Sequence, residues 1–402
     1  MTLVPLGDVA EVISGVGFPK DLQGASEGDV PVFKVGDISN AIKSGTHFLR
    51  KSPNNLSKAD AHKLSKTLMP VGTIVFAKIG EGLKLNRRAV LSQPSLVDNN
   101  VMGLVPKSGI ATSSYLFYFM QTVDLGTLSR ATAVPSVRKS DVVDLSIPLP
   151  SMAQQDEIVA ELEKQFSCLD DAVANLQRVK ANLKRYKASV LNDAVEGRLI
   201  EGDYQYEMVK LGSVANVVDP QPSHRTPPTH ADGVPYIGIG DVLGNGKVDL
   251  QNSRKVAPTV LAEHRARYTL RRGDFIFGKI GTLGKPTLLL PPYNYTLSAN
   301  VVLVQADGVR LLPEYALIFM ESPKLVNMVN RDAKATTQAA YGIKRMRDLD
   351  IELPTIEVQL QITSEVDRRL SLLRRVESEV DTNLKRAQAL RQATLHKAFG
   401  PS

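Results

Sequence analysis

The chain has 402 residues with 43% hydrophobic and 23% charged side chains, which is typical of a globular protein of two or three domains. It contains no run of 18 apolar residues and no signal-peptide pattern at its start, so we expect a cytoplasmic protein that makes no contact with membranes. The single cysteine excludes an internal disulfide bond and a cluster of thiolate metal ligands, while a net charge of +7 favours a polyanionic partner.

Short apolar blocks separated by turn residues fill the first part of the chain. Two blocks, residues 4–12 and 30–38, each predict a strand or short helix that ends in a Gly-Asp turn. Residues 72–80 predict a buried strand that delivers a lysine to a loop flanked by glycines. Residues 115–120 predict an amphipathic helix, and residues 144–150 predict a last strand. This mixture of short strands and helices predicts an α+β globule.

Residues 150–197 predict a long helix, in which Ser151 and Gln154 have the spacing of an N-terminal capping box and Gly197 suits the first position beyond the end. Apolar residues recur at alternating steps of four and three, which is the seam of a coiled coil, and only Gln165 interrupts them. Such a helix is roughly 60 Å long and cannot bury its own stripe, so it needs a partner. The seam includes Ile158, Leu162, Leu169, Leu176 and Leu183.

The same blocks recur in the same order in the second half of the chain, after a linker at residues 198–206. A second long helix is predicted for residues 354–399, and its seam keeps the heptad phase of the first. The recurring blocks are residues 209–217, 234–242, 273–281, 315–320 and 348–354, and the second seam includes Ile362, Val366, Leu373, Val380 and Leu390.

These repeats predict a chain of the α+β class, built from two similar globules in tandem at residues 1–149 and 207–353. One long helix, residues 150–197, follows the first globule, and another, residues 354–399, follows the second. Because neither helix can bury its stripe alone, we expect each to be the other's partner. The segments between matched blocks differ freely, which favours related tasks on different targets.

Basic residues surround the loops at matched places in both halves. Lys78 and Lys279 stand at the ends of two matched strands, where a buried strand can hold a side chain rigidly. Such loops can reach phosphates or base edges, although each charge taken singly is also typical of a solvated loop. With 5% aromatic residues and no tryptophan, stacking on single strands is disfavoured, so the sequence favours duplex grooves. The candidate DNA-binding residues are Lys78, Lys84, Arg87, Arg88, Arg138 and Lys139 in the first half, and Arg265, Arg267, Arg271, Lys279, Lys285, Lys344 and Arg345 in the second.

Motifs of known catalytic sites are missing from the sequence or incomplete in it. There is no Walker loop, His-Glu-x-x-His pair, cysteine cluster or Gly-x-Ser-x-Gly turn. Residues 236–240 look like a glycine-rich turn for S-adenosylmethionine, but the position that matches Gly238 in the first half is Lys34. Residues 290–293 look like the Asn/Asp-Pro-Pro-Tyr motif of amino-methyltransferases, but Leu290 lacks the polar atom that the motif needs. We therefore predict no catalytic residue, no cofactor and no metal site in this chain.

Taken together, the blocks resemble the specificity subunit of type I restriction-modification systems over nearly the full chain. The resemblance rests on the Leu-Gly-x-Val-Ala blocks that begin at Leu6 and Leu211, on the two strand-Lys-Ile-Gly blocks, and on the Leu-Pro steps into the heptad helices. It implies that the helices pack as an antiparallel coiled coil with pseudo-two-fold symmetry. It also implies that each globule is a target-recognition domain for one half of a split site in double-stranded DNA, and that the helices set the gap between the halves.

The same resemblance implies partners. Two DNA-methylation subunits would bind S-adenosylmethionine, two restriction subunits would use ATP, and the chain itself would be no enzyme. Two other interpretations stay open at this point: a self-contained DNA-modifying enzyme such as an adenine methyltransferase, and a coiled-coil scaffold protein without DNA readout. A tight S-adenosylmethionine site in the isolated chain would favour the first, whereas a lack of sequence-selective DNA binding would favour the second.

Overall fold

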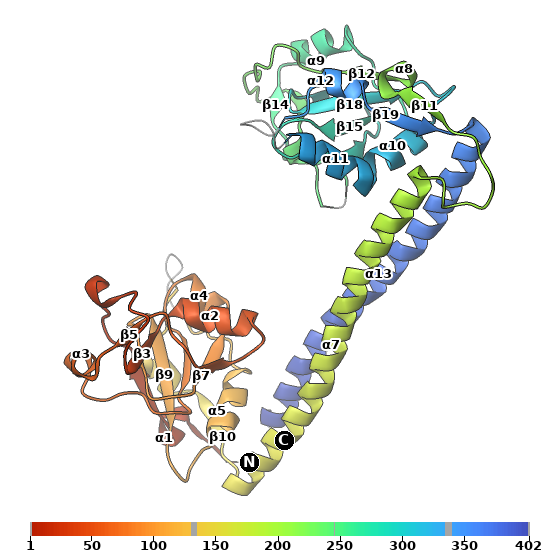
Figure 1. The fold of residues 1–402 in the computed structure, drawn as a ribbon. Helices are drawn as coiled ribbons and strands as arrows, with labels where there is room; N and C mark the ends of the chain where they lie inside the picture. The colour runs from red at the N-terminus through yellow and green to blue at the C-terminus, as the bar shows by residue number, and fades with distance from the viewer. Residues whose placement is uncertain (1, 130–134, 245, 334–339, 401–402) are drawn as a thin grey trace. The chain divides into compact units, whose positions relative to one another are not determined.

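A computed structural model describes residues 2–129, 135–244, 246–333 and 340–400. The chain divides into two compact units (Figure 1). Unit 1 contains residues 1–176 and 382–402, and unit 2 contains residues 177–381. Both units combine strands with helices, which confirms the predicted α+β class. No helix in the described ranges is long and apolar enough to cross a membrane.

In unit 1 the main sheet has the strand order β2-β9-β6-β7-β4, and smaller sheets have the orders β5-β3-β8 and β1-β10. The central strand β6 is a continuous apolar run because both of its faces are covered. Ile74 and Phe76 belong to one cluster of buried side chains and Val75 to another, as the alternation of a strand requires. The strands are β1 (Leu3–Pro5), β2 (Ala10–Ser14), β3 (Val30–Phe33), β4 (Phe48–Leu49), β5 (Asn55–Leu56), β6 (Ile74–Ala77), β7 (Arg88–Leu91), β8 (Leu96–Val97), β9 (Val101–Pro106) and β10 (Ser146–Pro148). The short helices are α1 (Leu6–Val9), η1 (Lys20–Leu22), α2 (Val35–Lys43), α3 (Lys58–Leu64), α4 (Glu81–Lys84), α5 (Ser113–Met120) and α6 (Lys139–Val143).

Helix α5 carries much of the core of unit 1. It begins at the N-cap Thr112, whose Oγ1 accepts a hydrogen bond from the backbone N–H of Tyr115 at 3.2 Å. Tyr115 is fully buried, its hydroxyl donates to the carbonyl oxygen of Pro148 at 2.7 Å, and its ring centroid lies 5.1 Å from that of Phe399. The burial of one such side chain contributes about 2 kcal/mol to stability. Helix α5 therefore joins the sheet of unit 1 to the end of the second long helix.

Unit 2 repeats this architecture, with a main sheet of order β12-β18-β15-β16 and smaller sheets of orders β14-β13-β17 and β11-β19. Phe275 and Phe277 of β15 face the cluster that contains α10 and α11, while Ile276 faces the cluster on the other side, which includes Tyr268 just after α9 (Figure 1). The strands are β11 (Glu207–Lys210), β12 (Ala215–Val218), β13 (Val234–Ile237), β14 (Lys255–Val256), β15 (Phe275–Gly278), β16 (Gly284–Leu288), β17 (Thr296–Leu297), β18 (Val301–Ala306) and β19 (Asp350–Leu353). The short helices are α8 (Leu211–Val214), η2 (Ile239–Asp241), α9 (Pro258–Arg265), α10 (Pro313–Glu321), α11 (Pro323–Ala333) and α12 (Ile343–Arg347).

The two long helices are α7 (Met152–Val195) and α13 (Ile356–Phe399), each of 44 residues. The capping box predicted for the first is confirmed, because the backbone N–H of Gln154 donates to Ser151 Oγ at 3.4 Å and the N–H of Ser151 donates to Gln154 Oε1 at 3.1 Å. Gly197 has φ +70°, the left-handed conformation expected just beyond a helix end.

Parts of the two long helices contact each other inside each unit. In unit 1, Asp170 of α7 forms an ion pair with Arg391 of α13 at 2.6 Å. In unit 2, Lys180 pairs with Asp381 at 2.6 Å. Both pairs are largely exposed and contribute little energy, so the apolar residues between the helices carry the contact. Of the predicted seam, Leu162, Ile362, Val366, Leu373 and Val380 are buried, whereas Ile158, Leu169, Leu176 and Leu183 are half-buried.

The predicted seam is wrong at Leu390, which is 54% exposed. Near this end of α13 the buried side chains are Leu395 and Phe399, and in α7 the buried neighbour of Gln165 is Phe166. The reason is that these ends of the helices also pack on α5, as the contacts of Phe166 and Phe399 with its tyrosines show. At these ends, the buried side chains of each long helix therefore face the globule as well as the partner helix.

A buried glutamine joins the first turn of each long helix to its globule. Gln155 donates Nε2 to the carbonyl oxygens of Ile110 and Pro150 at 2.8 and 3.2 Å, and its Oε1 accepts from the N–H of Thr112 at 3.0 Å. Gln359 makes three corresponding bonds in unit 2, to Arg310 O at 2.7 Å, Pro354 O at 2.9 Å and Leu312 N at 2.8 Å. Both glutamines have 0% exposure. Both N–H groups of each amide are thereby used, and its Oε1 keeps one of its two acceptor positions free.

One buried polar group distinguishes unit 2 from unit 1. His264, at the end of α9, is 1% exposed; its Nδ1 is hydrogen-bonded with Thr296 Oγ1 and lies 3.3 Å from the Tyr268 hydroxyl. In unit 1, the strand register places Leu96 where Thr296 lies, and Leu64 ends the helix that corresponds to α9. Burial, helped by the charge of Arg267, lowers the pKa of His264 to about 4.

The free energy of unfolding is therefore expected to fall as the pH drops from 6.5 towards 4. A histidine in the unfolded chain takes up a proton near pH 6.5, whereas His264 in the folded chain stays neutral until about pH 4, so in this window the unfolded state binds more protons. Chemical denaturation across this window measures the loss. The variant His264→Leu introduces the residue type present in unit 1, and its free energy of unfolding should depend less on pH. If the free energy of unfolding had the same pH dependence in both proteins, His264 would not be its source.

Candidate nucleic-acid interface

The lysine loop of unit 1 is fixed by its backbone. Directly after β6, the N–H of Lys78 donates to Asn100 O at 2.9 Å, and the carbonyl oxygen of Lys78 accepts from Val137 N at 2.9 Å. The second bond brings Lys78 beside Arg138 and Lys139, which cap and begin α6. The loop turns at Gly80, the residue before α4. Its φ is +76°, a conformation that glycine adopts without steric cost. Three predicted residues from distant parts of the sequence are thus brought together.

The lysine loop of unit 2 has the same hydrogen bonds. The N–H of Lys279 donates to Asn300 O at 2.9 Å, and its carbonyl oxygen accepts from Tyr341 N at 2.8 Å. Gly281 also has φ +76°. Lys344 and Arg345 lie on α12, a few residues beyond Tyr341. Each loop is therefore held between the residue before a central strand and the segment that leads into a short helix, α6 or α12.

Most predicted cations are accessible. Lys84 has an exposed ion pair with Glu81 at 2.7 Å, which holds it only weakly. Arg265 and Arg271 each donate Nη2 to a backbone carbonyl oxygen, of Tyr293 at 3.2 Å and of Ala306 at 2.8 Å. The exposed residues are Lys84, Arg138, Lys139, Arg265, Arg267, Arg271, Lys285, Lys344 and Arg345, and the half-exposed ones are Lys78 and Arg87.

Not all of these residues belong to one surface. Arg271 lies before β15 and Lys279 directly after it, so the length of the strand, about 13 Å at 3.3 Å per residue, separates them. Arg271 is also bound to Asp274, with 3.6 Å between Nε and Oδ1. The structure therefore groups Lys279 with α12 and leaves Arg271 at the opposite end of the sheet.

Arg88 does not have the position expected of a DNA contact. It is the first residue of β7, is 4% exposed, and donates to Asn86 O at 2.6 Å, to Asn86 Oδ1 at 2.9 Å and to Val123 O. Burial lowers its pKa to about 10, so the guanidinium is still charged at neutral pH. Its two Nη groups donate within the globule, where they brace the loop around Val123, and this corrects its assignment as a surface cation.

Lys279 differs from the expectation in the same way. It is 3% exposed, and its Nζ donates to Asp219 Oδ2 at 2.7 Å. Asp219 follows β12 and is far from Lys279 in the sequence, so no local spacing predicts this pair. A lysine whose amine is buried in an ion pair is not free to bind a phosphate, and the predicted direct contact is corrected accordingly.

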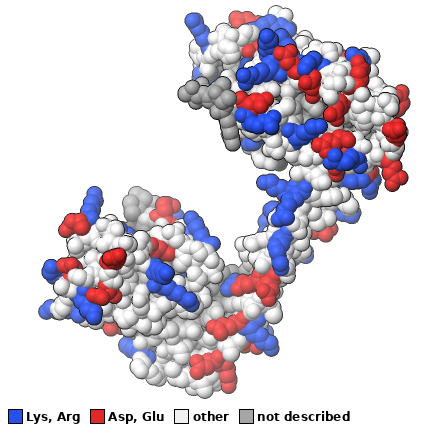
Figure 2. Space-filling view, viewed as in Figure 1, with Lys and Arg blue, Asp and Glu red and all other residues white. Residues whose placement is uncertain are grey.

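The charge of each unit is dispersed on the face that Figure 2 shows. Lysines and arginines alternate there with acidic residues and do not form one continuous patch. Among the described residues, no group of three His, Cys, Asp or Glu side chains is placed to hold a metal ion. Steering of a polyanion would thus come from a few local clusters rather than from the modest net charge.

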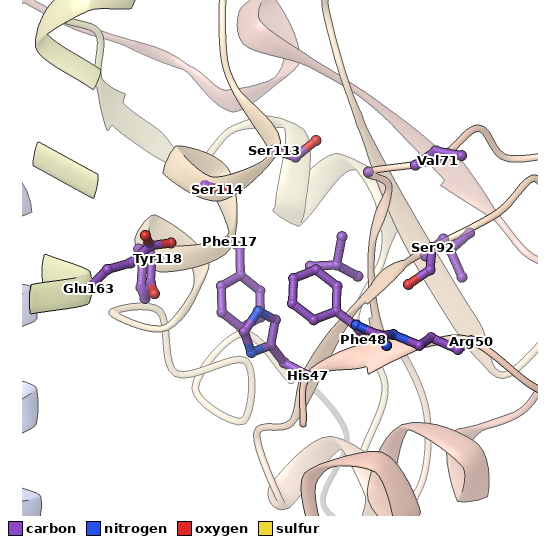
Figure 3. A pocket seen from close by; sticks show the side chains of 13 residues that line it. His47, Phe48, Arg50, Val71, Ser92, Ser113, Ser114, Phe117, Tyr118 and Glu163 are labelled. Atoms are coloured by element: carbon purple, nitrogen blue, oxygen red, sulfur yellow. The ribbon is translucent and has the colours of Figure 1, made fainter. Parts of the chain in front are cut away.

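Sequence reasoning missed a cavity of about 550 Å³ in unit 1 (Figure 3). His47 stacks on Phe117 of α5 with 4.4 Å between ring centroids, and Phe48, 40% exposed, lies beside them. Burial and the charge of Arg391 lower the pKa of His47, so it adds no positive charge at neutral pH. The lining is largely aromatic and apolar, with Arg50 at its edge. No sequence signal identified it, because residues 43–68 match no block of the second half.

Residues 1–181 match the family model described as the type I restriction modification DNA specificity domain. Among curated relatives, the chain is 24% identical to the type I restriction enzyme EcoKI specificity subunit of Escherichia coli strain K12, over 99% of this chain and 88% of that protein. It is 21% identical to the EcoBI specificity subunit of Escherichia coli, over 98% of this chain and 85% of that protein.

Solved structures show the same fold. A chain from a structure of the assembly and conformational transition of a type I R-M system matches with a TM-score of 0.74 at 18% identity, over 99% of this chain and 97% of that chain. The HsdS subunit from Thermoanaerobacter tengcongensis matches with a TM-score of 0.56 at 17% identity, over 99% of this chain and 96% of that chain. Specificity subunits are the non-catalytic, DNA-recognition components of type I restriction systems. Over nearly its whole length the chain is similar to type I specificity subunits, and the family model matches its residues 1–181, as the resemblance of its sequence blocks implied.

Proposed function

We propose that the chain binds a bipartite site in duplex DNA, that each globule reads one half-site, and that the bound chain directs methylation and restriction subunits to the site. The observation that carries this proposal is the pair of lysine loops. Both follow a central strand, both are held by the same two backbone hydrogen bonds, and both lie beside a short helix with exposed cations. Two equivalent rigid loops in one chain fit a target with two halves.

We propose that phosphate contacts come from the exposed cations near these loops. In unit 1 these are Lys78, Lys84, Arg87, Arg138 and Lys139. In unit 2 they are Lys285, Lys344 and Arg345, with Arg265 and Arg267 near the end of α9. Contacts of this kind fix the register of a protein on DNA, whereas base choice comes from neighbouring side chains in the grooves.

We further propose that residues 1–149 and 207–353 are the two target-recognition domains, joined by the linker 198–206 and followed by helices at 150–197 and 354–399. The matched joints of Gln155 and Gln359 support a duplicated chain with pseudo-two-fold symmetry and an antiparallel coiled coil. In this proposal the helices set the gap between the half-sites.

The proposed complex contains two DNA-methylation subunits, which bind S-adenosylmethionine, and two restriction subunits, which use ATP. Because its target is chromosomal or invading DNA, we place the complex in the cytoplasm. The chain contributes recognition and supplies no cofactor of its own.

Mapping of methylated bases in cells that express the chain with its methylation subunit tests the proposal. We expect methylation at one motif made of two short specific sequences separated by a gap of fixed length, and loss of methylation when the chain is deleted. Methylation that persists without the chain, or that follows one continuous motif, would contradict the proposal. A calorimetric titration of the isolated chain with S-adenosylmethionine should show no tight site.

A further inference from the structure

The two matched lysines have different surroundings. Lys78 is half-exposed and, among the residues that the structure describes, makes no ion pair. Lys279 is buried and paired with Asp219, whereas Ser14 ends β2 at the position in unit 1 that corresponds to Asp219. A serine cannot neutralise an ammonium group, so only unit 2 can hold its lysine in a buried ion pair.

The carboxylate of Asp219 connects Lys279 to a compact loop of residues 219–225, here called the Asp219 loop. Its Oδ2 accepts from Lys279 Nζ at 2.7 Å, and its Oδ1 accepts from the backbone N–H of Gln221 at 3.2 Å. Gln221 is buried and donates Nε2 to Ser223 Oγ at 2.9 Å and to Arg225 O at 3.1 Å. The pair therefore holds the first residue of the loop, and Gln221 holds the rest.

The tip of the Asp219 loop is exposed. His224, with φ +53°, has an exposed side chain whose Nε2 lies 3.9 Å from Asp219 Oδ2, and Arg225 next to it is also exposed. Pro220 and Pro222 restrict the backbone on either side of Gln221. A short loop with two prolines, a buried amide and a buried ion pair at its base has few alternative conformations.

A buried ion pair of this kind is a weak source of stability, because the desolvation of both charges offsets their attraction. Its effect is to specify geometry, since any movement of the loop leaves the ammonium of Lys279 buried without a partner. An imidazole and a guanidinium presented on a rigid loop can donate to guanine O6 and N7 in a major groove, and such base contacts discriminate between sequences.

We propose that Lys279 is a positioning residue, and that through Asp219 it fixes the Asp219 loop so that His224 and Arg225 contact the DNA half-site of unit 2. This inference rests on the proposed function. In unit 1 the corresponding lysine, Lys78, is free to contact DNA directly. The matched lysines of the two units thus have different roles: Lys78 contacts DNA directly, whereas Lys279 positions a loop that does so.

The test compares matched variants in the assembled complex with its methylation subunits. Binding is measured against salt concentration on the natural site and on sites with either half scrambled. Lys78→Met should weaken binding to all sites alike and lower the salt slope by about one, as expected for a lost phosphate contact. Lys279→Met should leave the salt slope unchanged and reduce the discrimination for the second half-site by about ten-fold or more, with the first half-site unaffected.

Two further variants separate positioning from stability. Lys279→Arg retains the ion pair and should restore most of the discrimination, while thermal unfolding reports whether each variant is folded. Arg225→Ala, at an exposed position that folding does not need, should reproduce the loss for the second half-site. If Lys279→Met fails to fold, the Arg225→Ala variant shows whether the Asp219 loop discriminates the second half-site, and Lys279→Arg shows whether the ion pair is needed for that.

A drop of about one in the salt slope of Lys279→Met, with discrimination retained, would overturn the inference in favour of a direct phosphate contact. Unchanged binding in a His224→Ala, Arg225→Ala double variant would overturn it as well. Both outcomes leave the proposed function standing, provided that the unmodified complex distinguishes both half-sites. A complex that distinguishes neither would refute the proposed function itself.

Discussion

Exchange of residues 207–349 for the corresponding segment of another specificity subunit is expected to change one half of the methylated motif and to leave the other half unchanged. The structural reason is that unit 2 has its own core, and that its globule begins and ends in neighbouring strands. Glu207 of β11 pairs with Leu353 of β19, and Lys210 pairs with Asp350. The segment can therefore be replaced with both of its ends close together.

The expected effect of this exchange on affinity is large. Each mismatched base pair costs about 1 to 3 kcal/mol, so a half-site with several changed pairs should lose about 10³-fold or more and approach non-specific binding. Methylation mapping identifies the new motif, and binding to the old and new sites at a stated salt concentration gives the size of the change. The reciprocal exchange of the first globule is the matched control. A hybrid in which both half-sites changed would contradict the division of the chain into two readers.

Four helix-forming residues inserted after Leu176, together with four after Asp381, are expected to widen the gap of the motif by one or two base pairs. These positions are the junctions between the two units in α7 and in α13, so contacts within each unit are retained. The insertions lengthen both helices by about 6 Å, whereas B-DNA rises about 3.4 Å per base pair. They also shift the heptad by four residues, a change that coiled coils absorb by local unwinding at some loss of stability.

The control for this experiment replaces four exposed residues in each helix by the inserted sequence without a change of length, and it should keep the original gap. Mapping of methylated bases measures the gap in both variants. If the longer chain retains methylation with an unchanged gap, the helices do not set the spacing.

Features that depend on nearby residues could be predicted from the sequence. Ser151 and Gln154 lie three residues apart, and this spacing alone determines a capping box. The blocks around Lys78 and Lys279 are likewise continuous stretches, and both form a strand followed by a turn at glycine. Repetition within the chain strengthened these predictions, because two independent copies of a block rarely match by accident.

Features that depend on distant partners could not be predicted. The buried state of Lys279 is determined by Asp219, which follows a different strand, and that of Arg88 by the carbonyl oxygen of Val123. Both cations look like surface residues when only their own blocks are considered. The error at Leu390 has the same origin, since a heptad pattern describes packing on one partner helix and does not include a globule.

The buried amides of Gln155 and Gln359 have a mechanical consequence. At the first turn of each long helix, two hydrogen bonds connect the buried amide to one segment of the globule, residues 110–112 or 310–312, and a third binds the proline just before the helix. Any tilt of the helix against that globule breaks bonds in a place that water does not reach, at about 1 to 3 kcal/mol for each group left unpaired. The base of each helix is therefore a stiff joint and not a hinge. Under the proposed function, torque that bent or twisted DNA applies to a globule is expected to pass into the helix and on to the partner subunits.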